Sequence, residues 1–365
     1  METTKRKLAS IAKIKSSVPV KDTDRLNVTR MEGKGWNVIT GRGEFAPGDL
    51  VVYFEIDSCL PIEDRYEFLR DRCLKNYREG QEIIKQVFRI RSMKLRGIYS
   101  QGLILPLSSF PEIKDPKEGD DVTELLQVEL FGDLEQRLNP SYHLSGEMMG
   151  DFPAWLEKTD EERIQNLSDL FENEGVRHTK FEVTEKYDGA SGTFVYAPEF
   201  SPDPFFVCSR NIRLKDTDDN VFWTISRKYG LKEKMQGLYA DKGVSYAIQG
   251  EVVGPGINSN RDKYEAVDFF VFRIKNVTEN RWLTPDERYT LCAELGLRHV
   301  RIIEKSMAVF ETIHSVEEIL DYVESYSDGK TERGHLREGM VFKSLPAGSL
   351  SFKAVSNKYL MKIGE

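Results

Sequence analysis

The stretch that decides the fold spans residues 181–192 and reads FEVTEKYDGASG. Its first five residues have the apolar and β-branched composition of a strand, and Lys186 follows them directly. Asp188 and Gly189 come next, followed by three small residues. Lysine side chains usually point into water, so a lysine between an apolar strand and a glycine turn raises the question of its role.

Lys186 could be a nucleophile, because a lysine reacts as the free amine. The ordinary lysine pKa is about 10.4, so we expect the surroundings to lower the pKa of Lys186. Partial burial near cationic groups or a metal has that effect. Gly189 would let the backbone turn sharply and a ligand approach closely. Taken alone, a Lys-x-Asp-Gly sequence is more typical of a surface lysine beside a turn.

The size and composition of the chain predict two soluble, globular domains. The chain has 365 residues, of which 39% are hydrophobic and 31% charged, and its net charge is −8. No apolar run approaches the ~20 residues of a membrane span, and the basic N-terminus lacks the apolar region of a secretory signal. The negative charge disfavours non-specific coating of nucleic acid but is compatible with a local basic groove.

The cysteines and histidines indicate neither disulfides nor a zinc site. The four cysteines are far apart and form no Cys-x-x-Cys pair, and the five histidines are scattered. We therefore expect reduced thiols and an intracellular protein of a reducing compartment, such as the cytoplasm, the nucleus or an organelle.

Residues 7–128 are predicted to be mostly β. Short apolar or alternating runs are separated by turn signals, and they lie at 8–14, 27–31, 36–39, 49–56, 87–90 and 102–106. Many short strands with regular turns predict a small closed barrel of the OB type.

Within this region, residues 86–97 alternate basic and apolar side chains. The basic residues of this stretch are Arg89, Arg91, Lys94 and Arg96. As one strand, the stretch would carry Arg89 and Arg91 on one face, with Lys94 or Arg96 as further candidates. Phe88 and Tyr99 would lie near enough to stack on bases. We predict that this face contacts nucleic acid. The alternative is a charged face that merely meets water.

Three helix starts are predicted in the rest of the chain. Thr159-Asp160-Glu161-Glu162 has the pattern of a capping box, and Arg163 would lie in the first turn of its helix. Two further capped helices begin at Thr284 and Ser315, and strands dominate elsewhere from residue 180 onward.

Six segments in a fixed order extend the motif around Lys186. They lie at 185–189, 209–211, 249–254, 268–274, 337–343 and 351–359. Together they resemble the signature of the covalent nucleotidyltransferase superfamily, which comprises polynucleotide ligases and mRNA capping enzymes. The resemblance implies an α+β chain with a nucleotidyltransferase (ATP-grasp-like ligase) domain of antiparallel sheets and flanking helices over residues 159–365.

The order of the parts indicates one branch of that superfamily. DNA ligases and capping enzymes place an OB domain after the terminal lysine motif, whereas seven residues follow Lys358 here. The barrel-like region, which we assign to residues 1–135, precedes a connector at 136–158. This order is similar to that of ATP-dependent RNA ligases with an amino-terminal OB domain, and the stretches 48–57 and 158–166 fit the same branch.

The resemblance also implies roles for individual residues. The catalytic residues would be Lys186, Asp188, Glu251, Glu338 and Lys353. The nucleotide-binding residues would be Glu185, Gly189, Arg210, Phe272, Val341, Lys343, Lys358 and Arg163. Phe272 and Val341 would sandwich the base. The family's last motif is Lys-x-Lys, but Val355 stands two residues after Lys353, so the second lysine is open and Lys358 is the candidate.

Three carboxylates around one point require a cation. Asp188, Glu251 and Glu338 would hold Mg²⁺ or Mn²⁺, through the water shell of the ion, because hard cations keep their waters.

The implied reaction has three phosphoryl transfers. Lys186 would take AMP from ATP, pass it to a 5′-phosphate, and a 3′-hydroxyl would then displace AMP. The partner would be RNA, at nicks in duplexes with RNA on the 3′-hydroxyl side, and we expect a monomer without membrane contact. Two alternatives are a nucleic-acid-binding protein with an inactive transferase domain and a capping-type guanylyltransferase that uses GTP.

Overall fold

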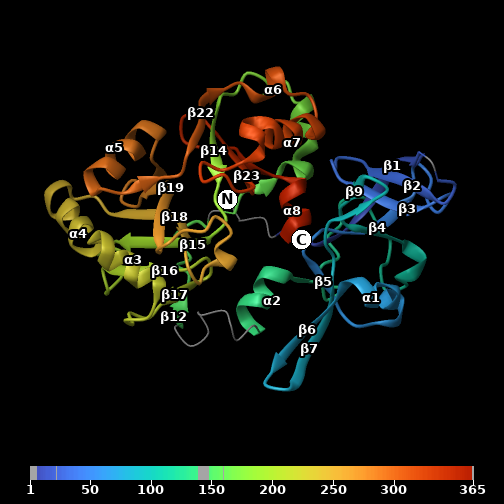
Figure 1. The fold of residues 1–365 in the computed structure, drawn as a ribbon, viewed down its shortest axis with the longest axis horizontal. Helices are drawn as coiled ribbons and strands as arrows, with labels where there is room; N and C mark the ends of the chain where they lie inside the picture. Colours follow the sequence, from blue (N-terminus) through green and yellow to red (C-terminus); the bar gives the residue numbers. More distant parts are fainter. Residues whose placement is uncertain (1–5, 22, 139–147, 159, 364–365) are drawn as a thin grey trace. The chain divides into compact units, whose positions relative to one another are not determined.

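The computed structural model describes residues 6–21, 23–138, 148–158 and 160–363. Contacts between residues divide the chain into two compact units, drawn as a ribbon in Figure 1. The first unit contains residues 1–145, 165–169 and 360–365, and the second contains 146–164 and 170–359.

The first unit is built on antiparallel strands. In its described part, one sheet has the order β10-β4-β1-β2-β3, and a second has the order β11-β5-β7-β6. Strands β8 and β9 pair with each other. The strands of the first sheet are β1 Ala9–Pro19, β2 Leu26–Met31, β3 Asn37–Gly41, β4 Leu50–Phe54 and β10 Leu103–Pro106. The remaining strands are β5 Ser58–Leu60, β6 Leu74–Glu79, β7 Glu82–Arg89, β8 Met93–Leu95, β9 Ile98–Ser100 and β11 Glu129–Leu130.

The long strand β1 holds the first sheet together. Its first half pairs with β4 and its second half with β2, and the register shifts between Ile14 and Ser16. Such a bulge bends a strand, which allows one strand to serve two neighbours. The helices of this unit are η1 Asp64–Leu69, α1 Arg70–Cys73, η2 Leu107–Ser109 and α2 Phe131–Leu138.

Two apolar clusters fill the first unit. One contains Phe54, Tyr66 and Phe88, and the other contains Trp36 and Tyr53. All five rings are fully buried. The prediction that Phe88 could stack on bases is therefore wrong, because its ring belongs to the core.

The basic stretch 86–97 does not form one strand. Strand β7 ends at Arg89, and β8 lies in a different pair of strands. Arg96 then turns the chain with a left-handed φ of 51°. The expectation of a single basic strand face is wrong, because alternation in the sequence continues across a break in the backbone.

The second unit consists of two antiparallel-rich sheets with flanking helices (Figure 1). One has the path β12-β17-β16-β15-β18-β19-β20, with β21 also on β19, and the other has the order β13-β24-β23-β14-β22. The strands of the larger sheet are β12 Met148–Asp151, β15 Ala190–Tyr196, β16 Phe205–Cys208, β17 Ile212–Leu214, β18 Tyr246–Val253, β19 Asp268–Asn276, β20 Arg281–Trp282 and β21 Arg298–His299. The strands of the smaller sheet are β13 Glu162–Arg163, β14 Phe181–Lys186, β22 Ile302–Met307, β23 Gly339–Ser344 and β24 Ser351–Val355.

The predicted helix ends at Thr284 and Ser315 are confirmed. Thr284 and Glu287 form a capping box at α5 Pro285–Leu295, and Gly296 ends it with a left-handed φ of 65°. Ser315 accepts a hydrogen bond from the Glu318 amide at α7 Val316–Ser325. Side-chain oxygens at these positions satisfy amides that have no partner inside the helix.

Other helices were not predicted. They are α3 Val221–Tyr229, α4 Leu231–Lys242, η4 Asn258–Asn260, α6 Val309–Thr312, η5 Tyr326–Gly329 and α8 Asn357–Ile363. Asn220 caps α3 by accepting from the amides of Phe222 and Trp223. The helix expected after residue 159 is present as η3 Ile164–Glu172, but its predicted start is wrong. Thr159 lies outside the described residues, Arg163 is in β13, and η3 is a 3₁₀ helix kinked at Leu167.

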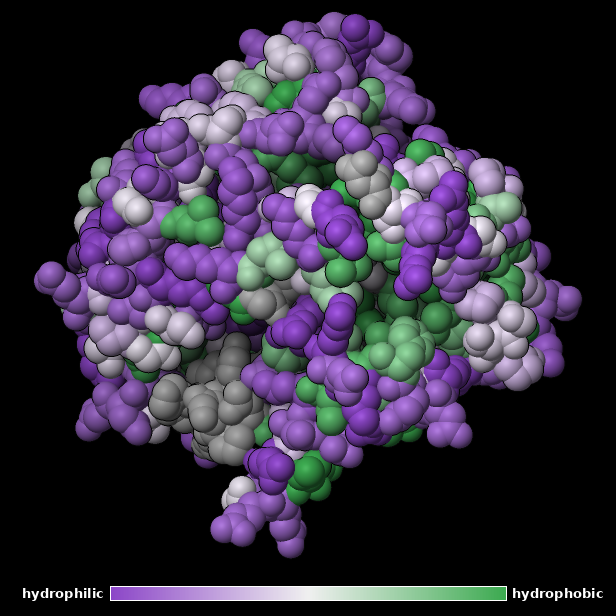
Figure 2. Space-filling view, turned by 45° about the vertical axis from the view of Figure 1, so that its right-hand side comes forward, coloured by the Kyte–Doolittle hydropathy of each residue, from purple (hydrophilic) through white to green (hydrophobic). Residues whose placement is uncertain are grey.

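The α+β class is confirmed by these elements. The described residues include no helix that is long and apolar enough to cross a membrane. Figure 2 shows a face of the molecule on which hydrophilic residues dominate and hydrophobic residues are scattered between them.

Candidate active site

The turn after β14 joins the two sheets of the second unit. Strand β14 belongs to the smaller sheet and β15 to the larger one, so residues 187–189 cross between them. Lys186 pairs with Gly339 of β23, and Ser191 pairs with Glu251 of β18. Glu338 directly precedes Gly339 in the sequence. Glu251 and Glu338 lie 65 and 152 residues after Lys186 in the sequence. The pairing of four strands brings both carboxylates close to the lysine.

Lys186 and Glu338 form an ion pair. The Nζ atom lies 2.6 Å from Oε1 of Glu338, and the two side chains are 25% and 17% exposed. The lysine of the opening motif is thus not a surface lysine pointing into water. The hydrogen bond holds the amine of Lys186 next to a group of acids that also includes Asp188 and Glu251.

The pKa values of Lys186, Glu251 and Glu338 are all raised, but for different reasons. Burial lowers the pKa of Lys186, but Glu338, Glu251 and Asp188 outweigh burial, and the pKa lies above the ordinary lysine value. Burial raises the pKa of Glu251 to about 8, with Lys186 opposing the shift and Glu338 adding to it. Burial also raises the pKa of Glu338. The expectation of a lowered lysine pKa is wrong for the ligand-free site, because three acids surround one amine.

Asp188 is held by an arginine that sequence reasoning missed. Nη1 of Arg261 lies 2.7 Å from Oδ2 of Asp188 and 3.2 Å from the hydroxyl oxygen of Tyr359. Arg261 lies 73 residues after Asp188 in the sequence, in a loop with no family motif. A cation-to-carboxylate contact of this kind has no sequence signal, so no pattern could have found it.

Close packing explains why residue 189 is a glycine. A Cβ atom on this residue would lie 2.3 Å from the carbonyl oxygen of Val252 and 2.8 Å from Cγ of Glu251. Real Cβ atoms essentially never come so close to a backbone oxygen. Glycine therefore lets β15 and β18 approach and keeps Glu251 close to Lys186.

The acids fit a hydrated divalent cation. Among the described residues, no three His, Cys, Asp or Glu side chains are placed to bind one ion directly. Within the same residues, Oε2 of Glu338 is buried and accepts no hydrogen bond, and Glu251 is half-buried beside it with a raised pKa. Excess buried carboxylate oxygen of this kind fits a cation that contacts the protein through its own waters.

A half-buried apolar patch lies on the neighbouring strands. Phe272 packs at the edge of a cluster formed by Val253, Phe270 and Val300. Lys343 donates a hydrogen bond to the Phe272 carbonyl at 3.0 Å, which ties β23 to β19. Val341 is half-exposed, two residues before Lys343 on the same strand face. A flat ring can be sandwiched by such side chains.

Lys343 is almost fully buried. Burial lowers the pKa of Lys343 to about 8, with Glu161 opposing the shift and Arg273 adding to it. Its ammonium lies 3.9 Å from Glu161.

Three further predicted cations lie close together. Strand β13 runs parallel to β24, and this places Arg163 opposite Lys353. Asp160 connects Lys353 to Arg210, at 3.2 Å and 2.5 Å. Lys353 also lowers the pKa of Glu338, against the larger effect of burial, which shows that its charge reaches the cluster.

Two predicted nucleotide-binding residues point elsewhere. Glu185 is buried and lies 3.4 Å from Arg337 and 3.5 Å from Arg301, on the face of β14 opposite Lys186. Lys358 lies on α8, where its ammonium is 3.3 Å from Glu324. The structure therefore does not bring either side chain to the amine of Lys186.

The predicted nucleic-acid residues of the first unit have separate surroundings. Arg89 pairs with Asp57 at 3.0 Å and stacks on Phe131, and Arg91 donates to the carbonyl of Arg72. Lys94 lies over the ring of Tyr99, and Arg96 is exposed in the following turn.

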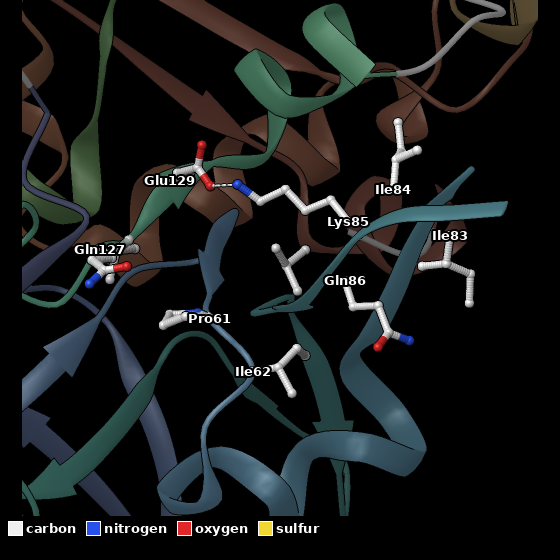
Figure 3. Close-up of a pocket in the computed structure, with 10 residues that line it drawn as sticks. Pro61, Ile62, Ile83, Ile84, Lys85, Gln86, Gln127 and Glu129 are labelled. Carbon is white, nitrogen blue, oxygen red and sulfur yellow. Dashed lines mark hydrogen bonds and ion pairs between the residues drawn. The ribbon is translucent and has the colours of Figure 1, made fainter. Parts of the chain in front are cut away.

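A cavity of about 720 Å³ also lies in the first unit (Figure 3). It is lined by Ile62, Ile83 and Ile84 and crossed by an ion pair between Lys85 and Glu129. None of its lining residues belongs to the predicted sites. We assign it no role in the chemistry around Lys186.

An OB-type β unit followed by two sheets that meet at a strand-end lysine defines the class of the covalent nucleotidyltransferases. Comparison with protein families makes the assignment specific: an OB-fold domain family matches residues 8–107, and the family described as RNA ligase matches residues 179–359. The chain belongs to the RNA ligase family.

Solved structures support this assignment. The chain is 37% identical to a Naegleria gruberi RNA ligase mutant with AMP and Mn, with a TM-score of 0.83 over 98% of this chain and 99% of that chain. A mutant of the same ligase with ATP and Mn is 36% identical, with a TM-score of 0.83 over 99% and 100% of the two chains. The ligase with PPi is 37% identical, with a TM-score of 0.83 over 98% and 99%. Comparison with curated protein sequences gave no match.

Proposed function

We propose that this RNA ligase is ATP-dependent and joins a 3′-hydroxyl to a 5′-phosphate through a lysyl-AMP intermediate. The observation that carries the proposal is the position of Lys186: a partly buried amine at a strand end, 2.6 Å from Glu338 and flanked by Asp188 and Glu251. The Naegleria ligase, which is similar over nearly the whole chain, has been solved with ATP, AMP and PPi.

Three transfers balance the reaction. First, Nζ of Lys186 attacks the α-phosphorus of ATP, an N–P bond forms, pyrophosphate leaves and the amine loses a proton. Second, an oxygen of the 5′-phosphate attacks the same phosphorus, the N–P bond breaks and the lysine regains a proton. Third, the 3′-hydroxyl attacks the 5′-phosphate, AMP leaves and the phosphodiester forms. Alignment and charge neutralisation supply most of the rate in such transfers.

The chain's own residues divide this work. Glu338 orients the Lys186 amine, and Gly189 leaves room for the nucleotide beside it. Phe272 and Val341 hold the base, while Lys343, Lys353, Arg210 and Arg163 offer positive charge to phosphate oxygens.

The acids Asp188, Glu251 and Glu338 would hold Mg²⁺ or Mn²⁺ through water. When bound, such a cation supplies positive charge at the phosphate oxygens.

The proposal also specifies the kind of RNA end that is joined. We propose that the ligase acts at nicks in duplexes, with RNA on the 3′-hydroxyl side and contact from Arg91, Lys94 and Arg96, as a monomer. Arg89 is the weakest member of the predicted set, because Asp57 neutralises it. All four cysteines are free and buried, which agrees with a reducing compartment.

The test uses Lys186→Ala in two assays. Incubation with labelled ATP and Mg²⁺ should label the wild type covalently and leave the variant unlabelled. Sealing of a preadenylated strand should survive in the variant, at least in part, because that step needs no lysyl-AMP. Lys180→Ala, at an exposed position directly before the same strand, is the matched control and should be labelled normally.

The same assays address the alternatives. Absence of any adduct in the wild type would support a binding protein with an inactive domain, and labelling by GTP in preference to ATP would support a capping-type enzyme. Equal sealing of nicks with RNA and DNA 3′ ends would remove the proposed RNA preference.

A further inference from the structure

Arg261 pairs with Asp188, two residues after Lys186, and has no role in the reaction as proposed above. Its Nη1 atom donates to Oδ2 of Asp188 at 2.7 Å, to the Tyr359 hydroxyl at 3.2 Å and to the Asn258 carbonyl at 3.2 Å. Three acceptors on one nitrogen fix the guanidinium plane. Among the described residues, no acceptor is hydrogen-bonded to its Nε or Nη2. With 34% of the side chain exposed, this second edge can meet a ligand.

The loop that carries Arg261 is built to hold it there. Asn258, Ser259 and Asn260 have left-handed φ values of 40°, 62° and 44°, a conformation that costs energy for residues with a Cβ. The side chain of Asn258 donates to the carbonyl of Gly189, so the loop is attached next to Asp188 itself. Asn260 closes the loop by exchanging two hydrogen bonds with the backbone of Tyr264.

The second proposed transfer would be favoured by a cation at this place. The 5′-phosphate brings negative charge into a site that already contains the acids Asp188, Glu251 and Glu338. Arginine is suited to the task, because its rigid fork binds phosphate oxygens in pairs and stays charged. A carboxylate that holds one edge of the fork leaves the other edge for the ligand.

We propose that Arg261 binds a phosphate group delivered beside Lys186, namely the 5′-phosphate of the strand that receives AMP. Asp188 and Tyr359 position the guanidinium for this contact. The inference rests on the proposed function. The same chemistry could serve the outer phosphates of ATP, so the test has one arm for each source.

The first arm compares nicked duplexes that carry a 5′-phosphate or a 5′-hydroxyl. Affinities are measured by fluorescence anisotropy without ATP, on protein freed of AMP by pyrophosphate. The wild type should prefer the phosphate by about tenfold to a hundredfold, the usual strength of a charged hydrogen-bond pair. Arg261→Gln should reduce this ratio to about one. Lys263→Gln, which removes an exposed cation from the same loop, should leave it unchanged.

A second pair of variants excludes simple repulsion by an unpaired acid. Asp188→Asn should keep the preference, because Arg261 remains. The double variant Asp188→Asn with Arg261→Gln should lose it, although no carboxylate is left exposed at 188. A double variant that regains the preference would overturn the proposal, since the loss would then belong to Asp188.

The second arm measures ATP affinity in the same variants. Arg261→Gln should change the ATP affinity by a smaller factor than it changes the preference for a 5′-phosphate over a 5′-hydroxyl. Weaker ATP binding with an intact 5′-phosphate preference would overturn the proposal and assign the arginine to the nucleotide. No 5′-phosphate preference in a wild type that forms the covalent adduct would also overturn it, while leaving the proposed function standing. Failure of the wild type to form the adduct would be a failure of the proposed function.

Discussion

At the scale of single residues, the carboxylates around Lys186 favour its protonated form. Lys186 is surrounded by three carboxylates, and their attraction exceeds the effect of burial on its pKa. In the proposed reaction the amine must lose its proton, and a divalent cation held by the same acids would offset their charge and so lower the pKa of Lys186.

Glu338→Gln should make the ligand-free lysine more reactive toward small electrophiles. Removing one carboxylate lowers the pKa of Lys186. At any pH between neutrality and the ordinary lysine pKa, the variant therefore contains more free amine than the wild type. Modification by an amine reagent, followed at Lys186 by peptide mass spectrometry from pH 7 to 10, should be faster in the variant and begin at lower pH. Lys180 serves as an internal reference in the same digest. An unchanged or slower rate at Lys186 would contradict the assigned cause of the raised pKa.

Phe272→Ala should weaken nucleotide binding more than it slows chemistry. Loss of a stacked aromatic costs about 1–3 kcal/mol per base, which corresponds to at least a several-fold rise in KM for ATP. Phe272→Tyr keeps the ring and should retain the wild-type KM. Adenylation kinetics at varied ATP concentration distinguish the two variants, and an unaltered KM in Phe272→Ala would remove this ring from the base site.

The sequence alone predicts part of this site. The motif around 186–189 predicted a reactive lysine. The motif acids at 251 and 338 do lie beside it, because β14 pairs with β23 and β15 pairs with β18 in registers that bring these positions together. The sign of the lysine pKa shift depends on charge balance in three dimensions, so it could not be predicted. Arg261 was invisible for the same reason, since only the fold brings it to Asp188.

At the scale of elements, the close approach of β15 and β18 fixes the site. Gly189→Ala should destabilise the protein by about 1–3 kcal/mol, the usual cost of overpacking, because its Cβ would collide with the Val252 carbonyl. Gly237→Ala is the matched control: it lies inside α4 with open space around it, and alanine should be neutral or stabilising by up to about 1 kcal/mol. Urea unfolding compares the two. Equal stability of Gly189→Ala and the wild type would show that the strands can separate without cost.

Elements were predictable where a local signal exists. The ends of α5 and α7 followed from capping residues, which act within one turn. The stretch 86–97 misled because periodicity carries no information about a chain reversal at Arg96 and Gly97, where both residues have left-handed φ values. The helix expected from residue 159 starts only at Ile164, because pairing with β24 draws Glu162 and Arg163 into a strand, a tertiary effect that overrides propensity.

At the scale of the whole molecule, the two units should contribute separable activities. Replacing Lys94 and Arg96 together by alanine should weaken RNA binding and reduce the slope of log affinity against log salt by about 0.7 per lost phosphate contact. Covalent labelling by ATP should be unaffected, because the lysine chemistry belongs to the second unit. Salt titrations of RNA binding, with labelling as the paired readout, test both statements. An unchanged salt slope would exclude these residues from the RNA contact.

The overall negative charge makes this test informative. With a net charge of −8, the chain has no general attraction for RNA, so binding must depend on local groups. Trp36 and the backbone at Gly35 contact Asn166 and Gln165, at 2.5 Å and 2.7 Å, within the first unit. The first unit therefore includes a segment distant in sequence, and point substitutions are a cleaner test than truncation.

The most direct test of the central claim is to locate the covalent adduct. The full chain is incubated with ATP and Mg²⁺, digested at a pH that preserves the nitrogen–phosphorus bond, and mapped by mass spectrometry. The account predicts that the peptide containing Lys186 gains the mass of one AMP group, and that the gain is lost when the digest is acidified. An adduct on any other residue, or an acid-stable one, would contradict the account.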